Sequence, residues 1–301
     1  MHTRAESSMP ALAGLYRRAA GQALADAARR RTRPAELPDE RLVVEGHRIP
    51  ERALRRWQAE IGPVDPASVP SVLVHTQVFG AAMALMAEPD FPLPLPGMVH
   101  LTNAVEHRRP AAAGEALDVT ARAVGLVPHH AGTAVDLHVA VREAGEPDDA
   151  PAAWEGVSRY LARGVHLAPL RPERPERAEF TPPAPTAQWT FDGGAGRRYA
   201  EVSGDWNPIH LSALSARAFG QRRAIAHGML LAARMLDRRE PGAAAFGEGF
   251  GWDVEFHAPV VLPARVAVRY EAAADGSTRV SAWDPRRGRP HLDGRIRHAR
   301  P

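Results

Sequence analysis

Apolar and polar positions form two successive blocks of the same order along the chain. In the first block, the run SVLVHTQVFGAAMALMAEPD at residues 71–90 is apolar on nearly all sides of a helix and therefore predicts a buried helix. Four segments of alternating character follow and predict antiparallel strands, because a period of two places apolar side chains on one face of a sheet. These segments read MVHLTNAVEH, EALDVTARAVGLV, AVDLHVAVREA and EGVSRYLARGV.

The C-terminal part repeats this order. A strand at 188–191 and a short helix at 195–202 are predicted first, and the apolar helix AHGMLLAARMLDRRE follows. The strands that come after it are GWDVEFHAPVV, ARVAVRYEAA, TRVSAWDP and LDGRIRHA. AVEHRRP in the first block occupies the place of DVEFHAP in the second. Two copies of one α+β unit explain the length of 301 residues, which exceeds that of a usual single domain.

A segment dense in proline and charge, at 171–187, reads as a linker between the copies. We place the first copy at 36–170, where the strand LVVEGHRIP and the helix ERALRRWQAEIG open it, and the second at 188–301. Residues 1–35 form a helical lead in which apolar positions share one face and arginines occupy the others. This helix either docks on the body or serves a membrane surface or a carrier protein.

Composition narrows the possible chemistry. All 38 basic side chains are arginine, and the formal net charge is only +3, which fits codon preference as well as a phosphate-bearing substrate or an acidic carrier. The absence of cysteine excludes disulfides and thiolate chemistry. No groove-reading motif accompanies the charge, so no nucleic-acid partner is expected. No apolar run approaches the roughly 18 residues that span a bilayer and no signal-peptide pattern opens the chain, so we expect a cytoplasmic protein without membrane insertion.

The segment YAEVSGDWNPIH at 199–210 gathers an acid, an amide and an imidazole within a few positions. Pro208 disfavours helical geometry at Asn207, so the chain bends and allows Asp205 and His210 to converge. A carboxylate and an imidazole directed at one water molecule can perform general acid and base catalysis, with Asp205 as the base. The alternative is that these side chains only cap a turn and fill a pocket.

Gly228 lies near the first turn of the second apolar helix. Backbone N–H groups there lack partners within the helix, and the helix dipole favours negative charge. A carbonyl oxygen that gains negative charge during a reaction would find an oxyanion hole at this point, worth about 3 to 4 kcal/mol per donor. Tight helix packing is the alternative reason for a glycine. His227 would orient the loop, touch the substrate or be a satisfied buried histidine.

Nine positions of the loop together resemble the hydratase-2 signature of the MaoC-like, (R)-specific enoyl-thioester hydratases and dehydratases. They are Tyr199, Val202, Ser203, Gly204, Asp205, Asn207, Pro208, Ile209 and His210. From about residue 36 the order of segments is similar to the double hot-dog members of this family, in which only the C-terminal half carries the signature. The resemblance implies an α+β fold of two antiparallel sheets, each wrapping a long central helix.

The resemblance also implies the reaction, the reversible hydration of trans-2-enoyl thioesters to (3R)-3-hydroxyacyl thioesters of coenzyme A or an acyl carrier protein, without a cofactor. The expected catalytic groups are Asp205, His210, the Gly228 amide and Asn207. The expected substrate-binding residues are Ser203, His227, Arg222 and Arg223. The two arginines either meet phosphates of the thioester carrier or form a solvated surface.

The first copy is expected to be catalytically silent. His75 stands at the place of His227, but Thr76 follows it and no Asp-x-Asn-Pro precedes it. In the resembling family such a loss leaves room for a longer acyl chain, so FGAAMALM lines an acyl tunnel or simply packs the core. The pair His129 and His130 forms a hairpin turn without a third ligand, so no metal site is expected.

Two other functions remain open for the chain. One is a non-catalytic protein that binds acyl thioesters, and the other is a thioesterase, which shares the hot-dog core but hydrolyses the carbonyl. A homodimer is possible, although two fused copies already supply a paired arrangement.

Overall fold

The structure is a computed structural model that describes residues 2–29, 32–168, 172–176, 179–218, 220 and 222–298. The chain divides into two compact units whose segments interleave in sequence. Unit 1 comprises Met1–Arg48, Thr76–Asn103 and Glu115–Glu176. Unit 2 comprises Ile49–His75, Ala104–Gly114 and Arg177–Pro301.

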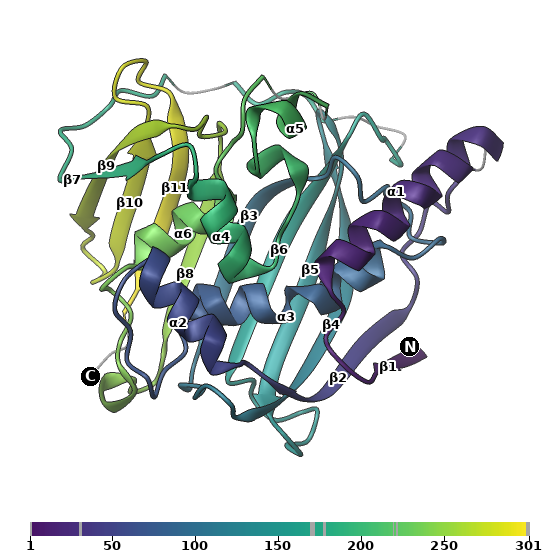
Figure 1. Cartoon of the computed structure of the whole chain (residues 1–301), viewed down its shortest axis with the longest axis horizontal. Helices are drawn as coiled ribbons and strands as arrows, with labels where there is room; N and C mark the ends of the chain where they lie inside the picture. Colours follow the sequence, from purple (N-terminus) through teal and green to yellow (C-terminus); the bar gives the residue numbers. More distant parts are fainter. Residues whose placement is uncertain are drawn as a thin grey trace. The chain divides into compact units, whose positions relative to one another are not determined.

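Unit 1 is built on a mainly antiparallel sheet in the order β1-β2-β4-β5-β6-β3. Its strands are β1 (His2–Glu6), β2 (Glu40–Arg48), β3 (Val99–His107), β4 (Ala116–His129), β5 (Gly132–Glu143) and β6 (Trp154–Arg163). In β4, Leu117, Val119 and Ala121 are buried in alternation, as the period-two pattern predicts. The helix α3 (Ser71–Met86) lies across one face of this sheet (Figure 1). Its residues from Val78 onward that belong to the predicted apolar run are almost all buried.

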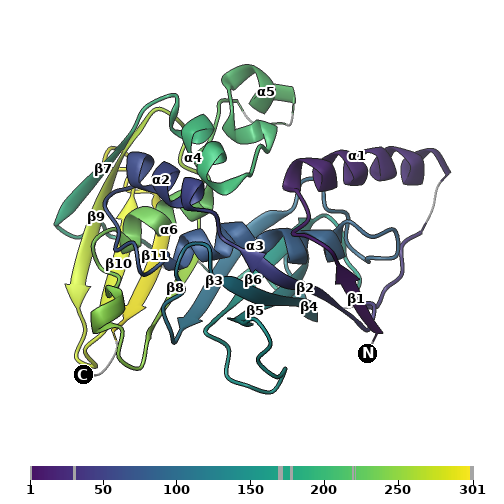
Figure 2. The same cartoon turned by 60° about the horizontal axis from the view of Figure 1, so that its bottom comes forward.

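The N-terminal helix α1 (Leu12–Arg29) is docked on unit 1. It lies on the same side of the sheet as α3 (Figure 2), and its own residues Leu15 and Ala19 are buried. Arg18 forms an ion pair of 3.6 Å with Glu88. These contacts fit the docked alternative for the helical lead; Arg30 and Arg31 lie outside the described residues.

Unit 2 contains an antiparallel sheet in the order β8-β11-β10-β9-β7. The strands are β7 (Ala187–Phe191), β8 (Phe250–Phe256), β9 (Ala264–Ala272), β10 (Thr278–Trp283) and β11 (Pro290–Arg297). Its helices are α2 (Glu51–Glu60), α4 (Ala195–Ser203), α5 (Ala213–Ala218) and α6 (Gly228–Leu236), with short 3₁₀ turns η1 (Pro208–His210) and η2 (Ala243–Ala245).

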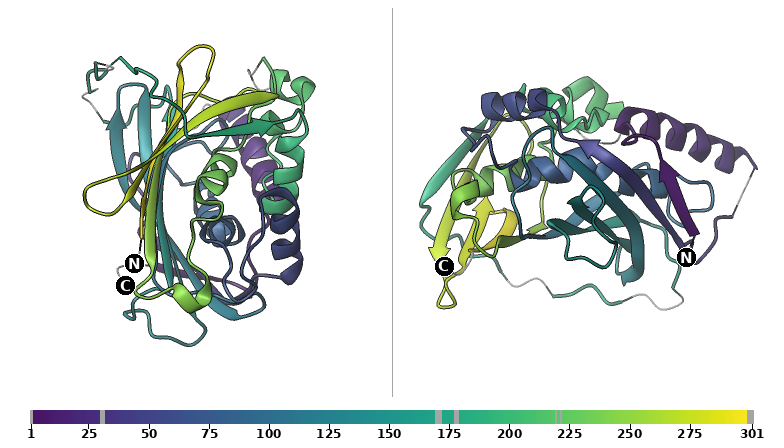
Figure 3. Two further views of the ribbon diagram at one scale, coloured as in Figure 1. Left: turned by 90° about the vertical axis from the view of Figure 1, so that its left-hand side faces the viewer. Right: turned by 90° about the horizontal axis from the view of Figure 1, so that it is seen from below.

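The helix α6 is the core helix of unit 2. Every residue of it except Gly228 and Arg234 is buried. It lies between the unit 2 sheet and the helices α2 and α4 (Figure 3, left). Gly294 of β11 leaves no room for a side chain beside Met235, so helix and sheet are in close contact. The hydroxyl of Tyr270 in β9 donates to the Arg234 and Met235 carbonyls at the end of α6.

The two units confirm the predicted double hot-dog fold of the α+β class. The helices and strands expected from periodicity are present, with α6 ending earlier, at Leu236, than the predicted run. Strand β1, which the sequence analysis missed, is a short segment that pairs in parallel with β2. The described linker residues 172–176 and 179–185 contain no helix or strand. None of the helices in the described ranges is long and apolar enough to cross a membrane.

The two compact units divide the chain differently from the boundaries predicted for the two copies. Residues 49–75 and 104–114 precede the linker but belong to unit 2, because α2 is bound to α4 and α6 by hydrogen bonds. The boundaries at 36–170, 171–187 and 188–301 were drawn from sequence order alone, and they stay a prediction about the repeated copies.

Candidate active site

The loop that carries the signature starts at the end of α4. Gly204 terminates this helix with a left-handed φ of 73°, and its N–H donates to the Ala200 carbonyl. A left-handed backbone conformation favours glycine at this position, and it turns the chain away from the helix axis. The hydroxyl of Ser203 donates to the Tyr199 carbonyl at 2.9 Å and accepts from the Asp205 N–H at 3.2 Å. Ser203 therefore fixes the backbone on both sides of the turn.

Two successive side chain to backbone turns then orient Asp205. Its Oδ1 accepts from the Asn207 N–H at 3.1 Å, and the Asn207 Oδ1 accepts from the Ile209 N–H at 3.3 Å. Pro208 opens η1 directly afterwards, as its effect on Asn207 predicts. The Asp205 Oδ1 and the Asn207 side chain thus cap turns, as the alternative interpretation of these residues proposed. The Asp205 Oδ2 accepts no hydrogen bond from a described residue, and 27% of the side chain is exposed.

His210 is a buried imidazole with one nitrogen committed. Its Nδ1 lies 2.8 Å from the Ile225 carbonyl oxygen. Since a carbonyl only accepts, Nδ1 carries the proton. Burial, reinforced by the neighbouring His227, lowers the pKa of His210 to about 3, although Asp205 opposes the shift. The ring is therefore neutral near pH 7, and Nε2 presents a lone pair that can accept a proton or a hydrogen bond.

His227 is bound to the loop from the other side. Its Nε2 donates to the Asp205 backbone carbonyl at 3.0 Å and lies 3.9 Å from the Asp205 Oδ2. Burial lowers the pKa of His227 as well. The ring stacks on His210 with centroids 3.7 Å apart, and Tyr199 packs at 5.1 Å. His227 thus holds the Asp205 main chain and supports the His210 ring.

The loop brings three chemically active side chains to one point. Asp205, His210 and His227 each offer a ligand atom, and these atoms lie within 4.8 Å of one another. The set suits a metal ion poorly, because the two imidazoles are nearly parallel, inclined by 25°. Lone pairs lie in the ring planes, so those of stacked rings cannot converge on one ion at about 2 Å. A carboxylate beside a neutral imidazole instead suits a water molecule.

The N-terminus of α6 lies directly beside these groups, since His227 precedes its first residue. His227 makes no side-chain cap hydrogen bond. Among the described residues, no partner accepts from the Gly228 or Met229 N–H. A Cβ at Gly228 would lie 3.1 to 3.2 Å from the Phe256 ring of β8. Both interpretations of Gly228 therefore fit the structure: its N–H has no partner among the described residues, and a side chain there would crowd the Phe256 ring. The oxyanion role stays a prediction.

The remaining predicted residues lie apart from this cluster or deeper in the protein. Ser203 is 5% exposed and binds only backbone groups of its own turn. Arg222 and Arg223 are exposed, and neither forms an ion pair with a described residue. His75 is buried, and the rings of His129 and His130 contact each other in the β4–β5 hairpin, inclined by 37°. Substrate contacts by Ser203, His227 and the arginines stay predictions.

Two supporting residues were missed from sequence. Gly196 in α4 packs against the His210 backbone, where a Cβ would overlap the carbonyl oxygen. Ile225 supplies the acceptor for His210. Neither residue type carries a chemical signal of its own, so no pattern pointed to them. Tyr199, by contrast, was part of the recognised signature, and its ring is fully buried next to His227.

Comparisons with known proteins give the family of the chain. The model of the MaoC like domain matches residues 179–282. A 3-hydroxyacyl-thioester dehydratase X of Mycobacterium tuberculosis is 32% identical over 265 residues, which cover 88% of this chain and 91% of the relative. The crystal structure of HtdX from M. tuberculosis covers 86% of this chain and 100% of its own, with a TM-score of 0.72 and 29% identity.

A crystal structure of a MaoC-like dehydratase from Phytophthora capsici has a TM-score of 0.68 at 19% identity and shares the fold. It covers 88% of this chain and 96% of its own. The extent of the match to the mycobacterial relative, together with the signature loop, decides the assignment. The chain belongs to the MaoC-like dehydratase family.

Proposed function

We propose that this protein catalyses the reversible hydration of trans-2-enoyl thioesters to 3-hydroxyacyl thioesters, with Asp205 and His210 as its acid and base groups. The observation that carries the proposal is the convergence of a partly exposed carboxylate and a neutral imidazole within 4.8 Å, next to an uncapped helix N-terminus. The similarity to a 3-hydroxyacyl-thioester dehydratase over 88% of the chain supports the same reaction. The R configuration at C3 follows from the family resemblance.

In the hydration direction, Asp205 acts as the general base. Its carboxylate accepts a proton from water while the water oxygen bonds to C3 of the enoyl group. His210 orients the same water through Nε2, because its Nδ1–H is held by the Ile225 carbonyl. The C2=C3 electron pair moves toward the thioester carbonyl, and the protonated member of the pair returns the proton to C2. Dehydration is the reverse sequence.

The enolate oxygen formed in this step requires a donor. The Gly228 N–H at the start of α6 supplies one, with the helix dipole directed favourably. An oxyanion-hole donor is worth about 3 to 4 kcal/mol in the transition state. The absence of a side chain at Gly228 lets the thioester approach the backbone. Asn207 serves the reaction indirectly, by fixing the turn that presents Asp205.

The carrier moiety of the thioester is expected to lie toward Arg222 and Arg223. Their exposed guanidinium groups suit the phosphates of coenzyme A or of a phosphopantetheine arm. A comparison of turnover on coenzyme A and carrier-bound substrates of equal chain length separates these two carriers. A homodimer and a cytoplasmic setting stay predictions.

The test is turnover of crotonyl-CoA and longer trans-2-enoyl thioesters, followed as loss of the conjugated enoyl absorbance. We expect Asp205→Asn and His210→Ala each to lower kcat by at least a thousandfold, since each removes a group that contacts the reacting water. The matched controls Asp149→Asn and His298→Ala change exposed side chains and should keep wild-type rates.

The outcomes also address the alternative functions. Near-normal turnover by either active-site variant would refute the role of that residue. Lack of turnover by the wild type at every chain length would favour a binding protein. Release of free thiol during the assay would indicate a thioesterase, which the family assignment and the carboxylate–imidazole pair do not favour.

A further inference from the structure

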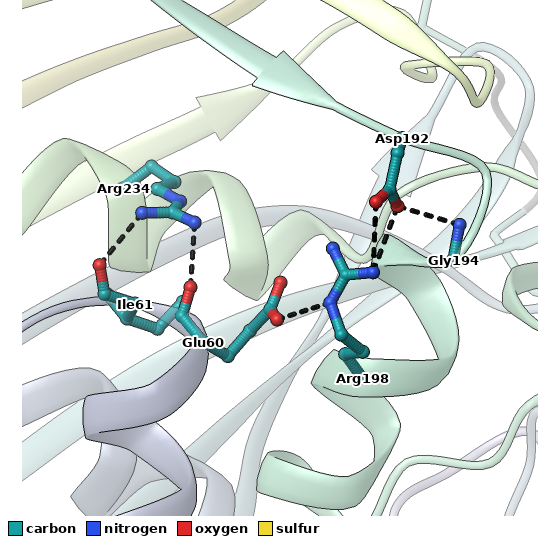
Figure 4. A network of polar contacts seen from close by, with 6 residues as sticks. All are labelled: Glu60, Ile61, Asp192, Gly194, Arg198 and Arg234. Carbon is teal, nitrogen blue, oxygen red and sulfur yellow. Dashed lines mark hydrogen bonds and ion pairs between the residues drawn. The ribbon is translucent and has the colours of Figure 1, made fainter.

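The C-terminus of α2 holds the helix that carries Gly228. Arg234 of α6 donates from Nη2 to the Glu60 carbonyl at 2.7 Å and from Nη1 to the Ile61 carbonyl at 2.8 Å (Figure 4). These carbonyls end α2, where the helix dipole is negative and hydrogen-bond acceptors are unsatisfied within the helix. The planar guanidinium bridges two consecutive carbonyls, which fixes orientation as well as distance.

The same end of α2 also holds α4. The Glu60 Oε2 accepts from the Arg198 Nε at 2.6 Å, and Arg198 donates from Nη1 to both oxygens of Asp192, at 3.0 and 3.1 Å (Figure 4). Glu60 is the main cause of the raised pKa of Arg198. Asp192 in turn accepts from the Gly194 N–H at 2.8 Å, just before α4 begins. One residue, Glu60, thus binds α6 through its backbone and α4 through its side chain.

A further contact lies one turn earlier on α2. Arg56 donates to the Glu201 carbonyl near the end of α4 at 2.9 Å. The chain passes from Glu201 through Gly204 into Asp205, so α2 is bound to α4 near both ends of that helix. Along α6, Arg234 lies six residues after Gly228, about 9 Å away at the rise of an α-helix.

We propose that Arg234 and Glu60 are positioning residues, which fix the α6 N-terminus relative to the Asp205 loop by binding α6 and α4 to a common anchor, the end of α2. Neither residue contacts the reacting atoms. Their effect is geometric, because a displacement of about 1 Å between catalytic groups costs on the order of a hundredfold in rate. This inference rests on the proposed function for its kinetic consequence.

The experiment compares variants at a temperature at which thermal unfolding shows each to be folded. Arg234→Met keeps an unbranched apolar stem and removes both hydrogen bonds; we expect kcat to fall about tenfold to a hundredfold with KM within about threefold. Arg234→Lys should restore part of the rate, since an ammonium replaces one of the two contacts. Glu60→Gln keeps the carbonyl for Arg234 and weakens only the contact to Arg198, so a smaller loss, about threefold, is expected.

The matched control is Arg55→Met on the same helix. Among the described residues, Arg55 forms an ion pair with Glu51 alone, within α2 and at 3.1 Å, and both side chains are mostly exposed. Its kcat and KM should equal those of the wild type. A residue that serves stability alone would lower the melting temperature without changing kcat below it. Folded Arg234→Met with kcat within twofold of the wild type would overturn the proposal.

Hydrogen exchange gives a readout that does not depend on turnover. In Arg234→Met, the amides of residues 204–210 and 228–231 should exchange at least severalfold faster than in the wild type, whereas Arg55→Met should leave them unchanged. If Arg234→Met fails to fold, Glu60→Gln and Arg198→Gln test the proposal instead. Wild-type values of kcat and of hydrogen exchange in both variants would contradict the role of α2 as an anchor. A wild type without turnover defeats the proposed function, and exchange alone then tests the anchor.

Discussion

Gly196 shows how a residue without chemistry of its own supports His210, the histidine proposed to act in catalysis. The backbone of α4 passes so close to His210 that a Cβ at position 196 would overlap its carbonyl oxygen. His210 keeps its Nδ1 on the Ile225 carbonyl only while the backbone stays in place. The site therefore depends on contact between two backbone segments that are separated by a turn.

We predict that Gly196→Ala displaces His210 and lowers both stability and rate. Overpacking of a close contact typically costs about 1 to 3 kcal/mol, and the shift should reduce kcat by at least tenfold. Urea unfolding and enoyl-thioester turnover measure the two effects. Gly193→Ala is the matched control, because a Cβ there meets nothing within 4 Å. Equal losses in both variants would contradict the specific role of Gly196.

At this scale the sequence predicted a local feature, the convergence of Asp205 and His210, because an acid, a proline and an imidazole at short spacing restrict one another, and atoms of the two side chains lie within 4.8 Å. Their catalytic roles stay a prediction. The bond from His227 to the Asp205 carbonyl spans 22 residues and left no pattern in the sequence. The same is true of the carbonyl of Ile225. A backbone acceptor is common to every residue type, so only the fold shows which one a histidine meets.

The start of α6 is an element whose position is set by packing as well as by chemistry. Gly228 faces the Phe256 ring of β8 and also leaves its N–H without a described partner. A single substitution at Gly228 disturbs both roles. A pair of substitutions can separate them.

We predict that Gly228→Ala lowers kcat by at least tenfold, through displacement of the helix start and obstruction of the thioester. Gly228→Ala combined with Phe256→Ala removes the steric conflict with the ring. Turnover should remain low in the double variant if close approach of substrate to the backbone matters. Recovery to the level of Phe256→Ala alone would instead show that packing is the whole reason for the glycine.

Elements with strong periodicity could be predicted, and those set by distant contacts could not. The all-apolar run of α3 and the alternation of β4 gave their type directly. Strand β1 has the sequence HTRAE, which lacks an apolar alternation, and its pairing with β2 is not visible locally. The helix α2 was expected, but not its contacts with α4 and α6, because no sequence pattern shows which distant carbonyl or carboxylate an arginine meets.

Buried histidines give the whole molecule a pH-dependent stability. Burial lowers the pKa of His75 to about 4 and the pKa values of His107 and His210 to about 3, and it also lowers that of His227. Each returns to about 6.5 in the unfolded chain, so unfolding takes up protons below that pH. Glu240 acts in the opposite sense, since burial raises its pKa to about 8. Burial also lowers the pKa values of His47 and His291, so the histidines outweigh the one glutamate and leave the balance toward acid destabilisation.

We therefore predict that the free energy of unfolding is highest near pH 7, declines slightly toward pH 8 because unfolding releases the Glu240 proton, and falls by several kcal/mol between pH 6.5 and 5, at about 1.4 kcal/mol per proton and pH unit. Urea unfolding at a series of pH values measures this slope. His107→Phe should reduce this slope, because it removes one of the titrating histidines. Phenylalanine suits the position, since His107 packs against Phe246 and Phe250 and its counterpart in the second copy is Phe256. A slope that is the same in this variant would exclude His107 as a contributor.

The anchoring of α4 and α6 by α2 has a consequence for how such a chain can be divided. The family match begins at residue 179, and the signature lies wholly after it, yet Glu60 and Ile61 are far upstream. A gene fragment trimmed to the recognisable half would encode the reactive groups and discard the support that aligns them. The C-terminal half of the reading frame alone therefore does not encode the whole of unit 2.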